Sequence, residues 1–505
     1  MSTGLSDVNR AADVVPLPPE LIDDLQALNP WWIGKPGAPL PTFRRSLYAG
    51  LLQSVQHGLT PVTALRGPRR VGKTILVRQI IEGLLAAGTP PKHLLYVPFD
   101  DIRAAAKLMD PVLQISRWFE RHVLGRTFNE TAHAGQTAYL FFDEIQNLKA
   151  WAPQLKHLVD NHAVRVLITG SSSLQIEAGR DSLAGRLMPL DIGTLLLREI
   201  AELRFGHSEP SRWPPNGQGD LTSLDFWRQT MSAMAGSAAF RKRAFVAYSQ
   251  VGGYPMAHQL PTPAWSQVSD YLMETVIRRV LTHDLPVARR RQPGDAQFME
   301  EVFRLACRYA GQTPGPAVFG PDLRTILHKD YTWNRVRRVL GTLDATLLLK
   351  LVPPLEIRLK RQTAPAKICL CDHALRAAWL QEQIPLDPDG LAKEPHLSDL
   401  AGRIAESVLG YFLASIPNLD VAHFPARASE PEVDFIITIG TKRIPVEVKY
   451  RKRIDPHEDT RGLRAFLEKS VYNAPLGLLV TLEDGVTVPD PRIVPISLSS
   501  FLWMR

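Results

Sequence analysis

The chain has 505 residues, which is enough for about two to four domains and excludes a single small module. Its 45% hydrophobic and 22% charged residues exclude a disordered or membrane-embedded chain, and its net charge of +8 favours polyanionic partners such as nucleic acid. The three cysteines are an odd number for a disulfide framework, so we expect a reducing, cytoplasmic location. We expect neither an export signal nor a membrane span.

The first half of the chain predicts a parallel α/β sheet. A proline-bearing lead-in with Trp31 and Trp32 comes first, and we expect it to pack on the domain that follows. Short apolar runs then alternate with helical stretches; they cover residues 62–65, 94–97, 139–142 and 164–169. This alternation is typical of a parallel sheet with helices on both faces.

The loop after the first predicted strand has the pattern G-x-x-x-x-G-K-S/T. It consists of Gly67, Pro68, Arg69, Arg70, Val71, Gly72, Lys73 and Thr74. Between a strand and a helix (75–87), such a loop wraps phosphate oxygens with backbone N–H groups. Lys73 can then reach the β and γ phosphates and Thr74 can ligate Mg²⁺, so the loop predicts an ATP site.

Polar residues follow the next predicted strands. Asp143 after the run 139–142 can hold Mg²⁺, and Glu144 can orient or deprotonate the attacking water; an ordinary solvated strand end is the alternative. Ser171 can sense the γ-phosphate or the water, or belong to a serine turn. Arg186 can act as an arginine finger on a neighbouring subunit's nucleotide, or form a surface salt bridge.

The middle of the chain predicts a helical lid (225–285) and then a winged helix-turn-helix. The winged unit is read from helices at 296–309, 321–328 and 332–343 and apolar runs at 347–351 and 357–359. Clustered cations there suit contacts with DNA phosphates: Arg335, Arg337 and Arg338 in the third helix, and Arg358, Lys360 and Arg361 in the wing. Docking of a protein is the alternative.

The last unit combines a helix (400–414) with strands at 433–437 and 443–448. Alternation places Glu447 and Lys449 on one face, with Asp434 on the adjacent strand and Glu406 on the preceding helix. Asp434 and Glu447 can hold Mg²⁺, and Lys449 can stabilise charge that develops on phosphate. The alternatives are exposed strand polars or a DNA-binding platform that does not cut.

Several of these segments resemble prokaryotic P-loop ATPases of the AAA+ superfamily with a DUF4143-type C-terminal region. They are residues 67–74, 140–147, 168–173, 183–186 and 252–255, and the similarity extends from about residue 42 to 481. The resemblance implies an ASCE-type ATPase core, a lid, a winged helix and a restriction-endonuclease-like domain. Glu406, Asp434, Glu447 and Lys449 resemble the PD-(D/E)XK nuclease superfamily, with a spacing from Asp434 to Glu447 similar to that of archaeal Holliday-junction resolvases.

The resulting hypothesis has five parts along the chain: a lead-in (1–41), the ATPase core (42–205), a loop and lid (206–292), a winged helix (293–390) and a nuclease-like domain (391–505). We expect a Mg²⁺-dependent ATPase that binds and remodels or translocates DNA, branched DNA included. We also expect a homo-oligomer, for which a hexameric ring is one form. The alternatives are a DNA-binding ATPase with a vestigial nuclease domain and an ATP-gated signalling or defence switch.

Overall fold

The computed structural model describes residues 16–102, 104–170, 182–214, 219–260, 263–284, 295–327, 331–356, 364–426 and 430–505. The chain forms two compact units, one of Met1–Gly67 and Gly72–Ile192 and the other of Pro68–Val71 and Gly193–Arg505. The sequence analysis ends the ATPase core at residue 205, whereas the first unit ends at Ile192. Helix α8 (Leu197–Phe205) belongs to the second unit, where it packs on α10 (Ala238–Val251).

The first unit is built on a five-stranded sheet in the order β2-β3-β4-β1-β5, and every neighbouring pair is parallel. Its strands are β1 (Val62–Arg66), β2 (Leu94–Pro98), β3 (Tyr139–Asp143), β4 (Arg165–Gly170) and β5 (Leu187–Asp191). The predicted parallel sheet is therefore confirmed, with one strand more than predicted. Strand β5 was not predicted because this edge strand is largely half-exposed and lacks a continuous apolar run.

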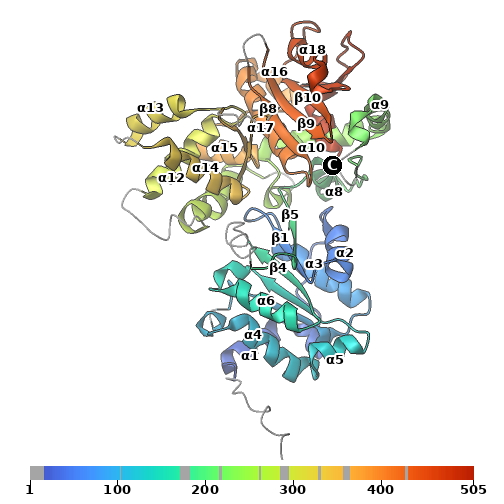
Figure 1. The fold of residues 1–505 in the computed structure, drawn as a ribbon, viewed down its shortest axis with the longest axis vertical. Helices are drawn as coiled ribbons and strands as arrows, with labels where there is room; N and C mark the ends of the chain where they lie inside the picture. The colour runs from blue at the N-terminus through green and yellow to red at the C-terminus, as the bar shows by residue number, and fades with distance from the viewer. Residues whose placement is uncertain are drawn as a thin grey trace, which may run out of the picture. The chain divides into compact units, whose positions relative to one another are not determined.

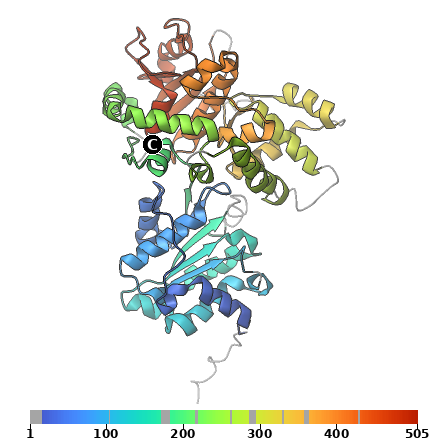
Figure 2. The same cartoon turned by 180° about the vertical axis from the view of Figure 1, so that it is seen from behind.

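Helices cover both faces of this sheet (Figure 1 and Figure 2). One apolar core joins the strand side chains Val62, Ala64, Leu140 and Phe142 to α1 (Pro19–Leu28), α4 (Pro111–Phe119) and α6 (Trp151–Asn161). On the other face, Ser54 of α2 (Tyr48–His57) shares a 3.1 Å hydrogen bond with Thr63. Helix α3 (Lys73–Ala86) packs beside α2, and α5 (Phe128–His133) completes the α-helices described in this unit.

The lead-in packs against the edge strand β2, as the sequence predicts. Asn29 accepts a 2.7 Å hydrogen bond from the Tyr96 N–H and donates a 2.9 Å bond to the Tyr96 carbonyl. The indoles of Trp31 and Trp32 both donate to the Leu94 carbonyl. These contacts satisfy backbone groups that an open sheet edge would leave exposed.

The second unit contains a mixed sheet in the order β12-β11-β10-β9-β8. Strands β8 (Asp420–Phe424), β9 (Val433–Ile439) and β10 (Lys442–Lys449) are antiparallel, whereas β10, β11 (Gly477–Thr481) and β12 (Ile493–Ser497) are parallel. Helices α17 (Ser398–Ala414), α18 (Arg461–Leu467) and α19 (Leu498–Trp503) pack on this sheet. Helix α17 approaches its neighbours closely, because a Cβ at Gly410 would lie 2.3 Å from Cys369 Sγ and 2.7 Å from the Phe435 ring.

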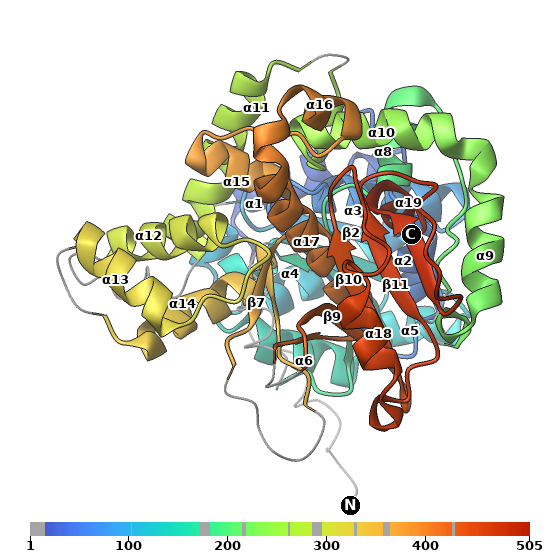
Figure 3. The same ribbon diagram turned by 90° about the horizontal axis from the view of Figure 1, so that it is seen from above.

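Three helices and a two-stranded hairpin lie together in the same unit (Figure 3). They are α12 (Asp295–Arg308), α13 (Pro316–Leu327) and α14 (Trp333–Ala345), with β6 (Leu349–Val352) antiparallel to β7 (Lys367–Leu370). The second apolar run predicted for the wing, 357–359, lies outside the described residues; the strand that pairs with β6 is β7. The hairpin continues into the mixed sheet, because Leu355 N–H donates to the His423 carbonyl of β8.

The remaining α-helices of this unit are α9 (Leu224–Ala233), α11 (Trp265–Leu272), α15 (His373–Leu380) and α16 (Pro388–Lys393). None of the helices in the described ranges is both long enough and apolar enough to cross a membrane.

A buried carboxylate fixes the glycine turn after α10. Asp372 accepts hydrogen bonds from Gly253 N–H at 2.6 Å and from Ala374 N–H at 2.8 Å, where it caps α15. Gly252 has φ 75° and ψ −162°, a conformation that is essentially restricted to glycine. A Cβ at Gly252 would lie 2.2 Å from Asp372 Oδ1, so both the backbone and the space require glycine.

We therefore expect Gly252→Ala to lower the free energy of unfolding by about 3 kcal/mol or more, because it adds backbone strain and a steric clash. Gly341→Ala is the matched control, since Gly341 lies inside α14 and a Cβ at this position would have no heavy atom within 4 Å. The control is expected to be neutral or to stabilise by up to about 1 kcal/mol. Urea denaturation of the two variants tests this, and equal stabilities would contradict it.

Candidate functional site

The phosphate-binding loop lies between β1 and α3 of the first unit. A Cβ at Gly67 would lie 2.3 Å from the Ile192 carbonyl oxygen, so only glycine fits there. Gly72 has φ 96°, which places it in the left-handed region. Lys73 is buried, and its ammonium donates a 3.1 Å hydrogen bond to the Gly67 carbonyl. The Lys73 side chain therefore folds back onto the phosphate-binding loop.

Asp143 ends β3 and is buried in a network of hydroxyl groups. Its Oδ2 accepts a 3.1 Å hydrogen bond from the Tyr96 hydroxyl, and its Oδ1 accepts one from the Thr169 hydroxyl. The Thr74 hydroxyl also hydrogen-bonds to this carboxylate. Burial raises the pKa of Asp143, and the hydrogen bonds from Thr169 and Thr74 oppose that rise.

Glu144 follows in a left-handed conformation, with φ 52°. Its N–H donates a 3.0 Å hydrogen bond to Thr169 Oγ1. Its Oε1 lies 3.9 Å from the Lys73 ammonium, and its Oε2 accepts a hydrogen bond from Gln146. The structure thus brings together Lys73, Thr74, Asp143 and Glu144, which the sequence analysis assigned to one site.

The donor set at this edge fits Mg²⁺. The Thr74 hydroxyl and the Asp143 carboxylate come from different elements and interact with each other, and both are oxygen ligands of the kind this ion prefers. A bound Mg²⁺ would neutralise charge on the β and γ phosphates. Thr74 and Asp143 are therefore the residues that would hold it.

Tyr96, Gln146 and the role of Thr169 were not predicted from the sequence. A signal existed, because the carboxyl ends of parallel strands meet at one edge of a sheet. Tyr96 in β2 and Thr169 in β4 lie on the two strands beside β3, close to that edge. Ser171, the residue proposed to sense the γ-phosphate, lies outside the described residues.

Arg186 lies at the amino-terminal end of the parallel strands, whereas the phosphate-binding loop lies at their carboxyl end. It directly precedes β5, and its carbonyl accepts a 3.1 Å hydrogen bond from Val62 N–H at the start of β1. The loop follows the other end of β1, about 16 Å further along at the usual rise of a strand. Its guanidinium pairs with Asp160 of α6, so Arg186 does not reach the nucleotide site of its own chain.

The arginines of α14 differ in their surroundings. Arg335 pairs with Asp295 and stacks over the rings of Phe298 and Tyr331, at 4.4 and 5.0 Å from their centroids. Arg337 and Arg338 are exposed. The wing cations Arg358, Lys360 and Arg361 lie outside the described residues. Of the described DNA-contact candidates, Arg335 is therefore engaged within the fold and the other two face solvent.

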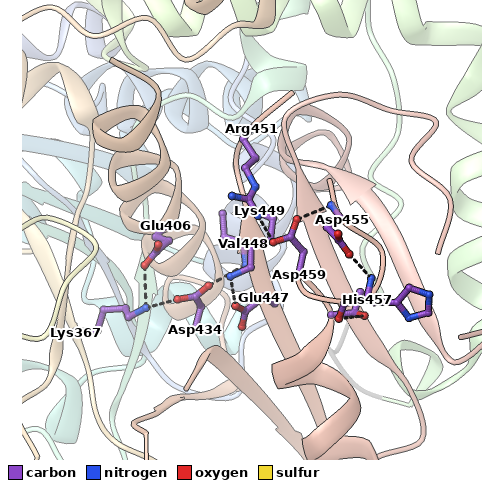
Figure 4. Close-up of polar contacts among 11 residues, drawn as sticks. Lys367, Glu406, Asp434, Glu447, Val448, Lys449, Arg451, Asp455, His457 and Asp459 are labelled. Carbon is purple, nitrogen blue, oxygen red and sulfur yellow. Dashed lines mark hydrogen bonds and ion pairs between the residues drawn. The ribbon is translucent and has the colours of Figure 1, made fainter. Parts of the chain in front are cut away.

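The C-terminal candidates converge on a cavity of about 680 Å³ in the second unit. A lysine that sequence analysis missed lies among them (Figure 4): Lys367 of β7 donates to Glu406 Oε2 at 3.0 Å and to Asp434 Oδ1 at 2.8 Å. Asp434 Oδ2 accepts a 2.9 Å hydrogen bond from Val448 N–H. Both oxygens of Asp434 are therefore engaged.

Glu447 and Lys449 form a second ion pair in this cavity, 2.6 Å apart, on the same face of β10 as predicted. Glu447 is 8% exposed, and its Oε2 has no hydrogen-bond partner among the described residues. Further along the chain, Arg451 pairs with Asp459, whose Oδ2 accepts from Asp455 N–H (Figure 4). Arg451, which follows β10, is thus held by a carboxylate.

The charges in the cluster depend on one another. Burial raises the pKa of Glu406 and of Glu447, each to about 8. Burial alone would lower the pKa of Lys367, but Asp434 and Glu406 raise it, so the lysine stays charged. Lys367 in turn holds the pKa of Asp434 below its usual value despite burial.

This arrangement does not fit the Mg²⁺ that the nuclease resemblance implies. An ammonium group already lies between Glu406 and Asp434, and no three Asp, Glu, His or Cys side chains in the described part of the chain converge in a way that could hold a metal. The predicted ligation of Mg²⁺ by Asp434 and Glu447 is therefore not supported by the geometry. A lysine within the short buried strand 367–370 was the only sequence signal for Lys367.

Comparison with known proteins agrees with the geometry of the first site. Residues 59–201 match the family described as AAA domain. This segment is an AAA domain. Residues 401–500 match a domain of unknown function, DUF4143; the match covers most of α17 and all strands of the mixed sheet. No curated protein matches the chain.

Solved structures share low sequence identity with the chain. The Walker-type ATPase PABY2304 of Pyrococcus abyssi is 13% identical and has a TM-score of 0.36, with coverage of 67% of this chain and 96% of that one. Cdc6p of Pyrobaculum aerophilum is 12% identical with a TM-score of 0.26 and covers 68% and 96%. The Aeropyrum pernix Orc1 protein in complex with DNA is 13% identical with a TM-score of 0.25 and covers 72% and 97%. Likenesses this weak carry no argument about the function of the AAA domain.

Thr169 is expected to stabilise the catalytic edge of the AAA domain. Thr169→Val keeps the shape but leaves the Glu144 N–H and the Asp143 carboxylate without their shared partner, so we expect it to lower the free energy of unfolding by about 1–3 kcal/mol. Thr169→Ser retains the hydroxyl and is the control. Chemical denaturation measures both, and a Val variant as stable as the Ser variant would show that the hydroxyl contributes nothing.

Proposed function

We propose that this chain is a cytoplasmic, Mg²⁺-dependent ATPase that binds DNA and remodels or translocates it. One observation carries the ATPase part: Lys73, Thr74, Asp143 and Glu144 meet at the carboxyl edge of the parallel sheet of an AAA domain. These residues supply a phosphate-binding ammonium, two Mg²⁺ ligands and a carboxylate for the attacking water.

Each group has a distinct role in hydrolysis. Lys73 leaves the Gly67 carbonyl to contact the β and γ phosphates, which offer stronger acceptors than a neutral carbonyl. Glu144 accepts the proton of the attacking water, and its hydrogen bonds to Thr169 and Gln146 hold it in place. Asp143 stays buried and serves as a ligand.

Glu144→Gln is expected to retain ATP binding and to lower hydrolysis by about 10²- to 10⁴-fold, because an amide cannot accept the proton. Lys73→Ala is expected to abolish tight ATP binding, since it removes the cation at the phosphates. Steady-state phosphate release and equilibrium binding of a fluorescent ATP analogue separate the two effects. A Glu144→Gln variant that hydrolyses ATP at the parental rate would show that Glu144 is not the base.

The same assays distinguish the alternative function. A parent protein that retains nucleotide without turnover, with and without DNA, would favour an ATP-gated signalling or defence switch.

Arg186 fits a role only in an oligomer. It lies at the far edge of its own sheet, so a finger role requires the nucleotide of a neighbouring subunit and release from Asp160. We propose a homo-oligomer, with a hexameric ring as its form, in which Arg186 completes the next subunit's site.

DNA binding is assigned to α12–α14 and the β6–β7 hairpin, taken as a winged helix. Two exposed arginines on α14, Arg337 and Arg338, support this assignment together with the net charge of +8. Contacts to phosphates fix position without reading sequence, so binding is expected to vary little between sequences.

Reversal of both charges, Arg337→Glu with Arg338→Glu, is expected to weaken DNA binding and to reduce the slope of log affinity against log salt by about 2. Arg278→Glu with Arg279→Glu is the matched control, because these neighbouring arginines are also exposed and the net charge changes equally. Fluorescence anisotropy at several salt concentrations tests this. Equal effects of the two double variants on DNA binding would instead favour a protein-docking role for this unit.

For the C-terminal domain, the lysine between Glu406 and Asp434 favours the second candidate function, a nuclease-like domain that does not cut. In this function the domain is a DNA-binding or assembly platform for the ATPase. Incubation of the full chain with single-stranded, duplex, forked and four-way DNA in Mg²⁺ or Mn²⁺ tests it. Intact DNA is the expected result, and divalent-dependent nicking would contradict it.

A further inference from the structure

The acidic cavity in the second unit contains its own cation. Among the carboxylates that line the cavity, those of Glu406, Asp434 and Glu447 each have one oxygen on a lysine ammonium. The two lysines have different origins. Lys449 belongs to β10, but Lys367 comes from the hairpin strand β7, and its side chain is only 2% exposed.

We propose that Lys367 is a tethered cation that keeps divalent metal ions out of this carboxylate cluster. Its ammonium lies 3.0 Å from Glu406 and 2.8 Å from Asp434, which is the position from which a metal would bind both. Ammonium and metal ion compete for the same oxygens, so only one of them can occupy the space.

Displacement of Lys367 is costly for two reasons. A buried ammonium that loses its anionic partners is left as an uncompensated charge, which is strongly unfavourable. The backbone of β7 is also fixed at the residues that follow the lysine. Leu370 N–H donates to Ser407 Oγ at 2.9 Å, and Ile368 exchanges hydrogen bonds with Gly311 and Gln312. Withdrawal of the strand would therefore break these hydrogen bonds and its pairing with β6.

The remaining oxygen of Glu447 shows that the cluster has capacity for another cation. Its Oε2 is buried in the lining of the cavity and accepts no hydrogen bond from the residues that the structure describes. Such an atom is unfavourable unless a ligand satisfies it. In the described part of the chain the three carboxylates do not converge on one metal position while Lys367 lies among them. Removal of its ammonium would free one oxygen each of Glu406 and Asp434 near Glu447, so that the three side chains can approach a divalent ion.

The test measures Mn²⁺ binding by the nucleotide-free full chain. Electron paramagnetic resonance detects the free ion and so reports how much Mn²⁺ is bound. Lys367→Met is expected to bind one additional Mn²⁺ per chain, at least about tenfold more tightly than the parent at this site. Adding Glu447→Gln to that variant is expected to remove the gain. Lys350→Met, on the paired strand β6, is the control and should behave as the parent.

Stability gives a second readout. Lys367→Met leaves carboxylates without their counter-ion, so it is expected to lower Tm, and Mn²⁺ is expected to raise the Tm of this variant but not of the parent. If Lys367→Met does not fold, Lys367→Met with Glu406→Gln removes one charge of each sign and should still gain Mn²⁺ through Asp434 and Glu447.

Two results would overturn the proposal. One is a parent that binds Mn²⁺ at this site as tightly as the lysine variant, and the other is a folded lysine variant that gains no Mn²⁺ by either readout. Neither readout involves ATP hydrolysis or DNA binding, so failure here is distinguishable from failure of the proposed ATPase function.

Discussion

Burial of the Lys367 ammonium is unfavourable unless anionic groups surround it, and three separate elements are positioned by that requirement. Strand β7 brings the lysine, α17 brings Glu406 and β9 brings Asp434. The glycine at 410 lets α17 lie directly against β7 and β9, so the charges meet at hydrogen-bond distance. The hairpin and the mixed sheet are thereby held as parts of one unit, although the sequence analysis divided them at residue 390.

The AAA domain pairs its buried charge differently. Asp143 is surrounded by the hydroxyls of Thr74, Tyr96 and Thr169, which come from α3, β2 and β4. Neutral hydroxyl donors can exchange a hydrogen bond to the carboxylate for a place in the shell of a metal ion, which a tethered ammonium cannot do. The two acidic sites of this chain thus differ in whether their carboxylates are available to bind Mg²⁺.

Asp372 is a further buried carboxylate, and it accepts hydrogen bonds from two backbone N–H groups. It joins the glycine turn after α10 to the start of α15, and the Gly253 carbonyl accepts a hydrogen bond from Leu195 N–H. Through these bonds the segment that follows the AAA domain's sheet is connected to the hairpin and to the helices around it.

The sequence by itself determined the local elements and the residues of the ATP site. Four of the five parallel strands, the phosphate-binding loop and the carboxylates Asp143 and Glu144 follow from periodicity and short-range spacing, because they depend on neighbours along the chain. Strand parity also placed Glu447 beside Lys449. Only the tertiary structure decided that Arg186 lies at the far edge of its sheet, that Arg335 is engaged by Asp295, and that Lys367 enters the C-terminal site. Each of these depends on a contact between residues far apart in sequence, and no local pattern records which oppositely charged group will be the partner.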